Sequence, residues 1–339
     1  MLSGLVGACA SLPWAFQKSF STCSSNSFAI VTTSSIPSIP SSGSTFPSTH
    51  YLLQKLQPCR TRRILVPRIR MSQSKVDEHH PVVQVESIAV KNNHGENLVG
   101  LLHETGSKDL VILCHGFRSS KDSAVMADLA DAISKEGISV FRFDFAGNGE
   151  SEGSFQYGNY LREADDLRSV IQYLSGRNHA VTTILGHSKG GDVVLLYASK
   201  YRDVPTIINV AGRYDLKKGI AERMGKDFME VIKRDGFIDV VSKKGQYRVT
   251  EESLMERLGT DMHAACLSID NGCRVLTVHG SSDEVISVED AYAFAKIIPN
   301  HELHIIEGAD HKFSKHQAEL AEVVLNFIKT SIQEGKDEA

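Results

Sequence analysis

The chain has 339 residues, of which 41% are hydrophobic and 23% are charged, a composition typical of a globular protein rather than a fibrous or disordered one. Its longest apolar runs, such as LVILC, are far shorter than the roughly 20 residues that a membrane-spanning helix needs. The net charge is −4, but the first 76 residues carry eight Lys and Arg and no Asp or Glu, so residues 77–339 carry −12. A body this acidic repels nucleic acid and anionic lipid, which argues against both as partners.

The first 76 residues differ in composition from the rest of the chain. Residues 1–50 contain 14 Ser and 5 Thr, and basic residues become more frequent toward residue 76. Transit peptides of organelles are rich in Ser, poor in acids and basic, and the scarcity of basic residues before residue 50 favours a chloroplast over a mitochondrion. The sequence therefore predicts a chloroplast transit peptide over 1–76, with a disordered leader as the alternative. Translation from Met71 would instead give a cytoplasmic protein.

From residue 81 onward, strand-like and helix-like segments alternate, separated by short polar connections. Several strand-like segments are continuously apolar, as strands covered on both faces must be. Apolar residues also recur at helical spacing over 164–174 and 320–328. This alternation predicts an α/β fold for residues 77–339, with a mostly parallel eight-stranded sheet and helices on both faces. The predicted strands are 82–90, 98–104, 109–114, 139–144, 181–186, 206–210, 274–279 and 302–307.

One long insertion interrupts this alternation. About sixty residues, from Arg213 to Gly272, separate two predicted strands that a single crossover helix could connect. Two apolar stripes at helical spacing lie within it, one over 219–237 and the other over 248–269. We interpret residues 213–272 as a small helical cap inserted over the active edge of the sheet, with a merely decorative insertion as the alternative.

Residues 184–196, ILGHSKGGDVVLL, place three glycines around one serine between two apolar runs. A predicted strand precedes this serine and a predicted helix follows it, so Ser188 stands on the turn between them, two residues from Gly186 and from Gly190. Such a turn is too tight for side chains beside the serine, and it exposes the hydroxyl at the carboxyl edge of the sheet. The pattern predicts that Ser188 is a nucleophile, and a glycine-rich turn without chemistry is the alternative.

A serine nucleophile needs a base, and the base needs a group that orients it. Asp283 and His311 each follow the end of a predicted strand, and the chain order Ser, Asp, His is typical of this architecture. Glu284 and Asp310 are the neighbouring acids that could replace Asp283. We predict Asp283, because Asp310 adjoins the histidine along the chain and the side chain of Glu284 should point elsewhere.

The oxyanion of the reaction needs two backbone N–H donors. The N–H of Lys189 starts the helix after the serine, and that of Phe117 follows the turn glycine Gly116 in the loop after an early strand. We expect the ring of Phe117 to line the acyl pocket. His115 is a candidate base, but its place beside the turn glycine indicates a histidine that supports the loop by hydrogen bonding.

The chain carries no motif for a cofactor or a metal. GNGESEG at 147–153 has the wrong spacing for a dinucleotide-binding loop, and neither a phosphate-binding loop nor an H-E-x-x-H zinc helix occurs. Three of the six cysteines lie in residues 1–76, and Cys114, Cys266 and Cys273 are too few and too widely spaced for a disulfide framework or a metal site. We therefore predict free thiols, with no cofactor and no metal.

Five segments together resemble the α/β-hydrolase superfamily: HGF at 115–117, DFAGNGESEG at 144–153, GHSKGG at 186–191, HGSSDEVI at 279–286 and GADH at 308–311. Within it, the chain is similar to plant feruloyl or cinnamoyl esterases and to serine aminopeptidase-like hydrolases over residues 80–330. The resemblance implies a triad of Ser188, Asp283 and His311, with an oxyanion hole from Phe117 and Lys189. Related enzymes often carry Met, Gln or another uncharged residue in place of Lys189, whose side chain would either favour an acidic leaving group or point to solvent.

The sequence therefore predicts a cofactor-free serine hydrolase that cleaves a small carboxylic ester or thioester through an acyl-enzyme intermediate. Its expected partner is a small-molecule acyl ester. Two alternatives remain open: an acyltransferase that uses an alcohol in place of water, and a protein that binds a ligand on the same fold without turning it over.

Overall fold

A computed structural model describes residues 83–337 of the chain. The predicted transit peptide lies outside the described residues. Within them, no helix combines the length and the apolar character that crossing a membrane requires. Cys114, Cys266 and Cys273 are free thiols, as predicted, and all three are buried.

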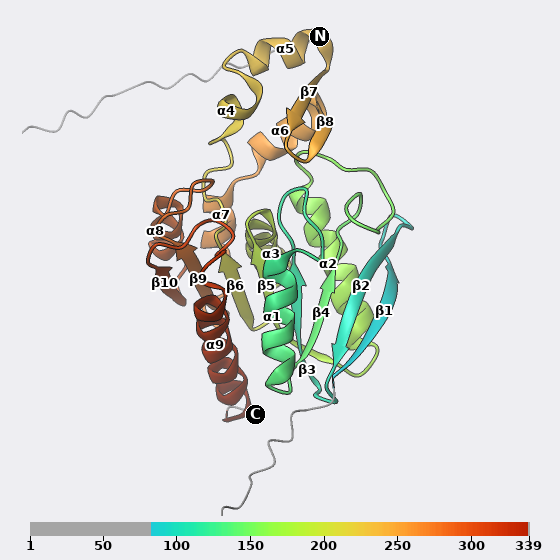
Figure 1. Ribbon diagram of the computed structural model, residues 1–339, viewed down its shortest axis with the longest axis vertical. Coiled ribbons are helices and arrows are strands. Elements are labelled where there is room, and N and C mark those ends of the chain that lie inside the picture. The colour runs from blue at the N-terminus through green and yellow to red at the C-terminus, as the bar shows by residue number, and fades with distance from the viewer. Residues whose placement is uncertain (1–82, 338–339) are drawn as a thin grey trace, which may run out of the picture. The chain divides into compact units, whose positions relative to one another are not determined.

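The centre of the described chain is an eight-stranded sheet with the order β1-β2-β4-β3-β5-β6-β9-β10 (Figure 1). β2 pairs antiparallel with β1 and with β4, and the other neighbours pair in parallel. All eight predicted strands are present. They are β1 (Gln84–Lys91), β2 (Asn97–Glu104), β3 (Asp109–Cys114), β4 (Ser139–Phe143), β5 (Ala180–His187), β6 (Thr206–Val210), β9 (Arg274–Gly280) and β10 (His301–Ile306).

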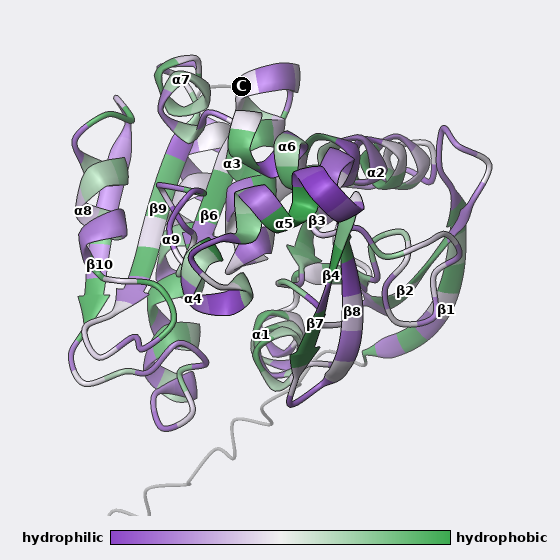
Figure 2. Cartoon of the chain, turned by 90° about the horizontal axis from the view of Figure 1, so that it is seen from above, coloured by the Kyte–Doolittle hydropathy of each residue, from purple (hydrophilic) through white to green (hydrophobic). Residues whose placement is uncertain are grey.

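Helices cover both faces of this sheet. α1 (Ala124–Lys135) and α9 (Gln317–Asp337) bury their apolar stripes against one face. The other face is covered by α2 (Tyr160–Ser175), α3 (Lys189–Tyr201), α7 (Met262–Leu267) and α8 (Glu289–Ala295). All five residues of β6 are buried, because helices pack on both of its sides. In Figure 2 the central strands are largely hydrophobic, whereas the outward-facing parts of α5 and α8 are hydrophilic.

The residues between β6 and β9 contain a β-hairpin that the sequence analysis did not predict. They form α4 (Ile220–Met224), α5 (Phe228–Asp235), β7 (Phe237–Ser242), β8 (Gly245–Thr250), α6 (Glu251–Gly259) and α7. β7 and β8 pair antiparallel around a two-residue loop, and Gly245 has the positive φ of 90° that few other residues adopt. Val240, Tyr247 and Val249 of the hairpin are buried against the helices of the insertion. Each strand is only six residues long, so its alternation of buried and exposed residues is too short to be recognised in the sequence beside the helical stripes.

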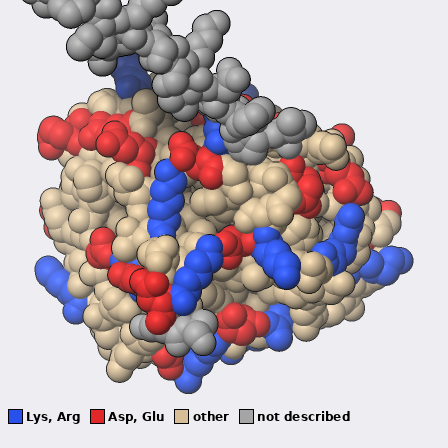
Figure 3. All heavy atoms as spheres, turned by 90° about the horizontal axis from the view of Figure 1, so that it is seen from below, with Lys and Arg blue, Asp and Glu red and all other residues tan. Residues whose placement is uncertain are grey.

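The insertion divides into two parts by its packing. α7 contacts α3 and belongs to the helical layer of the main sheet, with Met262 and Cys266 in that core. The segments from α4 to α6 have their own small core and lie at one end of the sheet (Figure 1). We call them the cap. Seen from the side opposite the cap, the surface carries interspersed acidic and basic side chains (Figure 3).

Candidate active site

The turn between β5 and α3 holds Ser188 in a strained conformation. Its backbone has φ 57° and ψ −121°, a combination that costs a non-glycine residue free energy and is typical of functional turns. A Cβ atom at Gly190 would lie 2.3 Å from the carbonyl oxygen of Cys114, and one at Gly186 would lie 2.0 Å from that of Gly190. Only glycine therefore fits at these two positions, and their absence of side chains allows the turn that exposes the Ser188 hydroxyl.

The structure brings the two other predicted triad residues to this serine. His311 follows β10, and its Nε2 lies 3.0 Å from Oγ of Ser188. Asp283 follows β9, and its Oδ2 lies 2.7 Å from Nδ1 of His311. A carboxylate accepts a hydrogen bond, so Nδ1 carries the imidazole proton and Nε2 is free to accept the serine proton. This is the hydrogen-bonding order that a serine nucleophile needs.

The carboxylate of Asp283 is held in place from several sides. Its Oδ1 accepts the backbone N–H groups of Val285 and Ile286, each at 2.8 Å. Nε2 of His279 lies 3.2 Å from its Oδ2, a contact that the sequence analysis did not anticipate. Burial alone would raise the pKa of Asp283, but hydrogen bonds from His279 and His311 outweigh it and lower the pKa well below its usual value. The side chain is therefore an anion at neutral pH, although it is not exposed to solvent.

The rival acids occupy other positions. Oε2 of Glu284 accepts the backbone N–H of His311 at 3.3 Å, and Oδ1 of Asp310 accepts the N–H of Ser314 at 2.7 Å. Neither carboxylate is hydrogen-bonded to an imidazole nitrogen of His311. The geometry thus favours the predicted acid over both neighbours.

Two backbone N–H groups beside Ser188 are available to a ligand. Those of Phe117 and Lys189 donate to no acceptor within residues 83–337. The loop that carries Phe117 approaches the serine closely: a Cβ atom added at Gly116 would lie only 3.0 Å from Cβ of Ser188. Lys189 is the first residue of α3, where unpaired N–H groups and the helix dipole favour negative charge. Both are suited to the predicted oxyanion role.

His115 supports this loop, as the sequence analysis expected. Its Nδ1 donates to the carbonyl oxygen of Gly116 at 2.8 Å, and its Nε2 accepts the N–H of Phe145 at 3.1 Å. Both ring nitrogens are therefore occupied. Burial lowers the pKa of His115 to about 4, so the ring stays neutral and keeps both bonds at neutral pH.

The loop that carries Phe117 is also fixed to the cap. Phe117 lines the cavity at Ser188, and its ring packs edge-on against Tyr157 and Tyr247, with centroids 5.6 and 5.7 Å apart. That this cavity takes the acyl group stays a prediction. The guanidinium of Arg118 donates to Oγ of Ser242 and to the carbonyl oxygen of Lys244, each at 2.7 Å. The hairpin therefore helps to position a predicted oxyanion donor.

The side chain of Lys189 does not point to solvent, which rules out one of the two alternatives given for it. It is buried, its Nζ lies 2.7 Å from Oε1 of Glu163, and it lies 4.9 Å from the ring centroid of Tyr160. Burial raises the pKa of Glu163 to about 7, and the attraction of Lys189 opposes that rise. The sequence analysis missed Glu163, although this acid precedes Leu167 by one helical turn on the apolar stripe of α2.

A cavity of about 170 Å³ adjoins Ser188 and His311. Arg213, Arg223 and Arg257 line it, and the sequence analysis named none of these three for the site. A second cavity of about 430 Å³ lies over the cap hairpin and shares Phe117 and Arg223 with the first.

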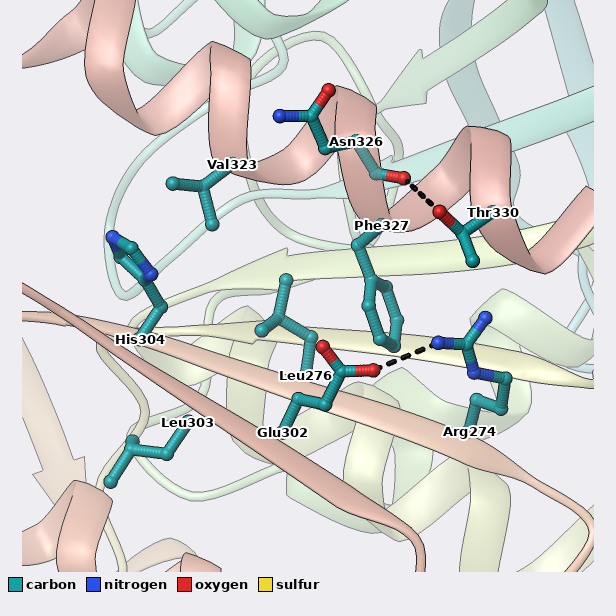
Figure 4. A pocket seen from close by; sticks show the side chains of 9 residues that line it. All are labelled: Arg274, Leu276, Glu302, Leu303, His304, Val323, Asn326, Phe327 and Thr330. Atoms are coloured by element: carbon teal, nitrogen blue, oxygen red, sulfur yellow. Dashed lines mark hydrogen bonds and ion pairs between the residues drawn. The ribbon is translucent and has the colours of Figure 1, made fainter.

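A cavity between β10 and α9, of about 320 Å³, contains no member of the triad (Figure 4). Figure 4 shows the guanidinium of Arg274 turned toward Glu302, and these groups are 2.8 Å apart. Arg274 also pairs with Glu334 at 2.6 Å. Because this cavity contains none of the three triad residues, the cavity at Ser188 is the candidate active site instead. Residues 83–337 hold no cluster of three or more His, Cys, Asp or Glu side chains placed for a metal ion.

Known proteins are similar to this chain in sequence and in fold. Residues 105–235, which include Phe117, Ser188 and Lys189, match the family described as "Serine aminopeptidase, S33". A monoglyceride lipase homolog of monkeypox virus is 28% identical over 258 residues, which cover 67% of this chain and 90% of that protein. The esterase Est1E of Butyrivibrio proteoclasticus, solved with ferulic acid bound, has a TM-score of 0.64 at 23% identity and covers 73% of this chain and 99% of its own.

The esterase Pf2001 of Pyrococcus furiosus is similar in fold, with a TM-score of 0.58 at 20% identity over 73% of this chain and 93% of that one. The chain therefore resembles members of the α/β-hydrolase superfamily in sequence and in fold. Its fold is the α/β-hydrolase fold predicted from the sequence, with the eight-stranded sheet and helices on both faces. The lipase and esterase matches support a hydrolase, and the superfamily's elbow turn is where Ser188 stands.

Proposed function

We propose that the protein is a cofactor-free serine hydrolase that cleaves a small carboxylic ester or thioester. One observation carries the proposal: Ser188, His311 and Asp283 form a continuous hydrogen-bonded chain, at 3.0 and 2.7 Å, beside a cavity. The relatives named as lipases and esterases support the same class of reaction.

The chemistry follows from the positions of these groups. Oγ of Ser188 attacks the ester carbonyl carbon while its proton moves to Nε2 of His311. The carbonyl oxygen becomes an oxyanion, which accepts hydrogen bonds from the N–H groups of Phe117 and Lys189. The ionised Asp283 stabilises the imidazolium that forms and keeps the ring in its orientation.

The tetrahedral intermediate then collapses. The bond to the alcohol oxygen or thiol sulfur breaks, and His311 gives its proton to this leaving group. An acyl group remains on Oγ of Ser188. Water attacks the acyl carbon with His311 again taking a proton, and release of the carboxylic acid restores the serine hydroxyl.

Turnover of a 4-nitrophenyl ester by the full chain tests the proposal. We expect a burst of 4-nitrophenolate equal to the enzyme concentration when deacylation is slower, and an acyl adduct on Ser188 in the intact mass. Ser188→Ala is expected to lower kcat by at least about 10³-fold, because it removes the attacking atom. Wild-type turnover by Ser188→Ala protein would show that Ser188 is not the nucleophile.

The same assay separates the alternatives from the sequence. Release of 4-nitrophenolate that becomes several-fold faster with an added alcohol, with the acyl group transferred to it, would indicate an acyltransferase. Binding of esters without any release would indicate a ligand-binding protein.

We further propose that residues 1–76 direct the protein to the chloroplast. Their Ser-rich, acid-free and basic composition supports this. A fusion of residues 1–76 to a fluorescent protein is expected to enter plastids and to be shortened there. The same fusion lacking 1–70, so that it starts at Met71, is the control and is expected to remain in the cytoplasm. Cytoplasmic fluorescence from both would refute the assignment.

A further inference from the structure

Three arginines converge on the cavity beside Ser188 from separate parts of the chain. Arg213 follows β6, Arg223 belongs to α4 and Arg257 belongs to α6. The last is the most enclosed, with 6% of its surface exposed. Burial of a guanidinium costs free energy unless polar or charged groups compensate it.

The partners of these arginines within the described chain are neutral. Arg213 donates to the carbonyl oxygen of Val285 at 2.6 Å, and Arg257 donates to the carbonyl oxygen of Leu216 at 2.9 Å and to the Tyr160 hydroxyl at 3.0 Å. The guanidinium of Arg223 lies 4.9 Å from the ring centroid of Phe117. None of the three forms an ion pair with a carboxylate of residues 83–337.

The other charged groups of the cavity do not cancel this positive charge. Lys189 is already paired with Glu163 at 2.7 Å. Asp192 lines the cavity, but its Oδ1 accepts the backbone N–H of Arg213 at 2.7 Å and it forms no ion pair with a guanidinium. Burial raises the pKa of Asp192, while the backbone N–H of Arg213 and the charges of Arg257 and Arg213 oppose that rise. One carboxylate cannot offset three guanidinium groups.

The neighbouring cavity has the same sign of charge. Arg118, Lys243 and Lys244 line it together with the shared Arg223, and Glu222 is its one acidic lining residue within the described chain. The body of the protein, residues 77–339, carries −12 overall. Positive charge is thus gathered at the cavities in an otherwise acidic molecule, which favours the approach of an anion to the nucleophile.

We propose that the substrate is an ester that carries a second, anionic group, a carboxylate or a phosphate, which Arg213 and Arg257 bind. This deepens the proposed function and rests on it. A guanidinium presents several N–H donors in a planar fork that matches a carboxylate or a phosphate. The cavity beside Ser188, at about 170 Å³, is by itself smaller than the roughly 300 Å³ at which pockets for drug-sized ligands begin.

Matched pairs of esters test the proposal. In the first pair the acyl portion varies: mono-4-nitrophenyl glutarate is compared with its methyl ester, which lacks the charge. In the second pair the alcohol portion varies: 4-acetoxybenzoate is compared with methyl 4-acetoxybenzoate. At low ionic strength we expect kcat/KM to favour the anionic member of at least one pair by about tenfold or more, since hydrogen bonds to charged groups have this magnitude.

Variants then assign the preference to the arginines. Arg213→Gln and Arg257→Gln are each expected to reduce the ratio of kcat/KM, anionic over neutral, by about tenfold or more. Arg248→Gln is the matched control: Arg248 is an exposed cap arginine, paired with Asp239 outside the cavity, and its loss should leave the ratio unchanged. A neutral ester that is preferred in both pairs, or ratios that neither cavity variant changes, would overturn the proposal.

Equilibrium binding separates this inference from the proposed reaction. In Ser188→Ala protein, we expect the preferred anionic ester to bind at least about tenfold more tightly than its neutral partner, and Arg257→Gln in that background to abolish the difference. Tighter anion binding without turnover by the wild type would refute the hydrolase and retain the anion site. If the wild type turns over both pairs of esters but Ser188→Ala protein binds the anionic and the neutral ester of each pair equally tightly, the hydrolase is retained and the anion site is refuted.

Discussion

Replacement of Asp283 by Asn is expected to lower kcat by about 10⁴-fold, as the equivalent change does in a comparable triad. In the wild type, Oδ2 of Asp283 lies 2.7 Å from Nδ1 of His311 and keeps the imidazole proton on that nitrogen. The amide of asparagine cannot keep it there. The ring would then present a protonated Nε2 to Ser188 and could not accept the serine proton. Turnover of a 4-nitrophenyl ester, after folding is checked by circular dichroism, measures the effect.

The two neighbouring acids supply matched controls. Glu284→Gln removes a charge that contacts only the backbone N–H of His311, and Asp310→Asn removes one that caps Ser314. Each is expected to lower kcat by less than about tenfold, because neither carboxylate sets the tautomer of the imidazole. Asp283→Asn retaining more than a tenth of wild-type turnover would show that another acid orients the histidine.

The features that the sequence predicted well depend on local constraints. The central parallel strands are buried on both faces, so their sequences can be continuously apolar, as in LVILC of β3. The turn at Ser188 needs glycine at Gly186 and Gly190, because carbonyl oxygens occupy the space of their Cβ atoms. Asp283 and His311 were found because parallel strands bring the loops at their carboxyl ends to one edge of the sheet.

The features that the sequence missed depend on contacts between distant segments. Lys189 and Glu163 lie on different helices. Of the arginines of the cavity, Arg213 follows β6, and the other two come from a cap whose packing no local pattern determines. A weak signal did exist. Glu163 falls on the apolar stripe of α2, and Arg257 lies three residues after the buried Leu254 on α6. A charged residue on a buried stripe indicates a buried partner or ligand, but periodicity alone does not identify it.

Replacement of Lys189 by Met is expected to lower the free energy of unfolding by about 3–5 kcal/mol at pH 8. The change leaves the carboxylate of Glu163 buried without its cation, since both side chains are about 5% exposed or less. Denaturation with urea measures the loss. Lys200→Met is the matched control, because Lys200 pairs with Asp165 between the same two helices but is 43% exposed. Its loss should cost less than about 1 kcal/mol.

The destabilisation by Lys189→Met is also expected to depend on pH. The pKa of Glu163 is raised by burial to about 7 in the presence of Lys189, from an ordinary value of 4.5, and loss of the cation raises it further. When the pKa of a carboxyl group is higher in the folded state than in the unfolded state, the protein becomes less stable as pH rises from the unfolded-state pKa toward the folded-state pKa. The loss should therefore be smaller at pH 5.5, where the folded state binds a proton at Glu163, than at pH 8.

The double variant Lys189→Met with Glu163→Leu should recover most of the stability at pH 8, because it removes the uncompensated charge. A loss equal to that of Lys200→Met, or one that is the same at both pH values, would show that the pair does not carry a buried charge.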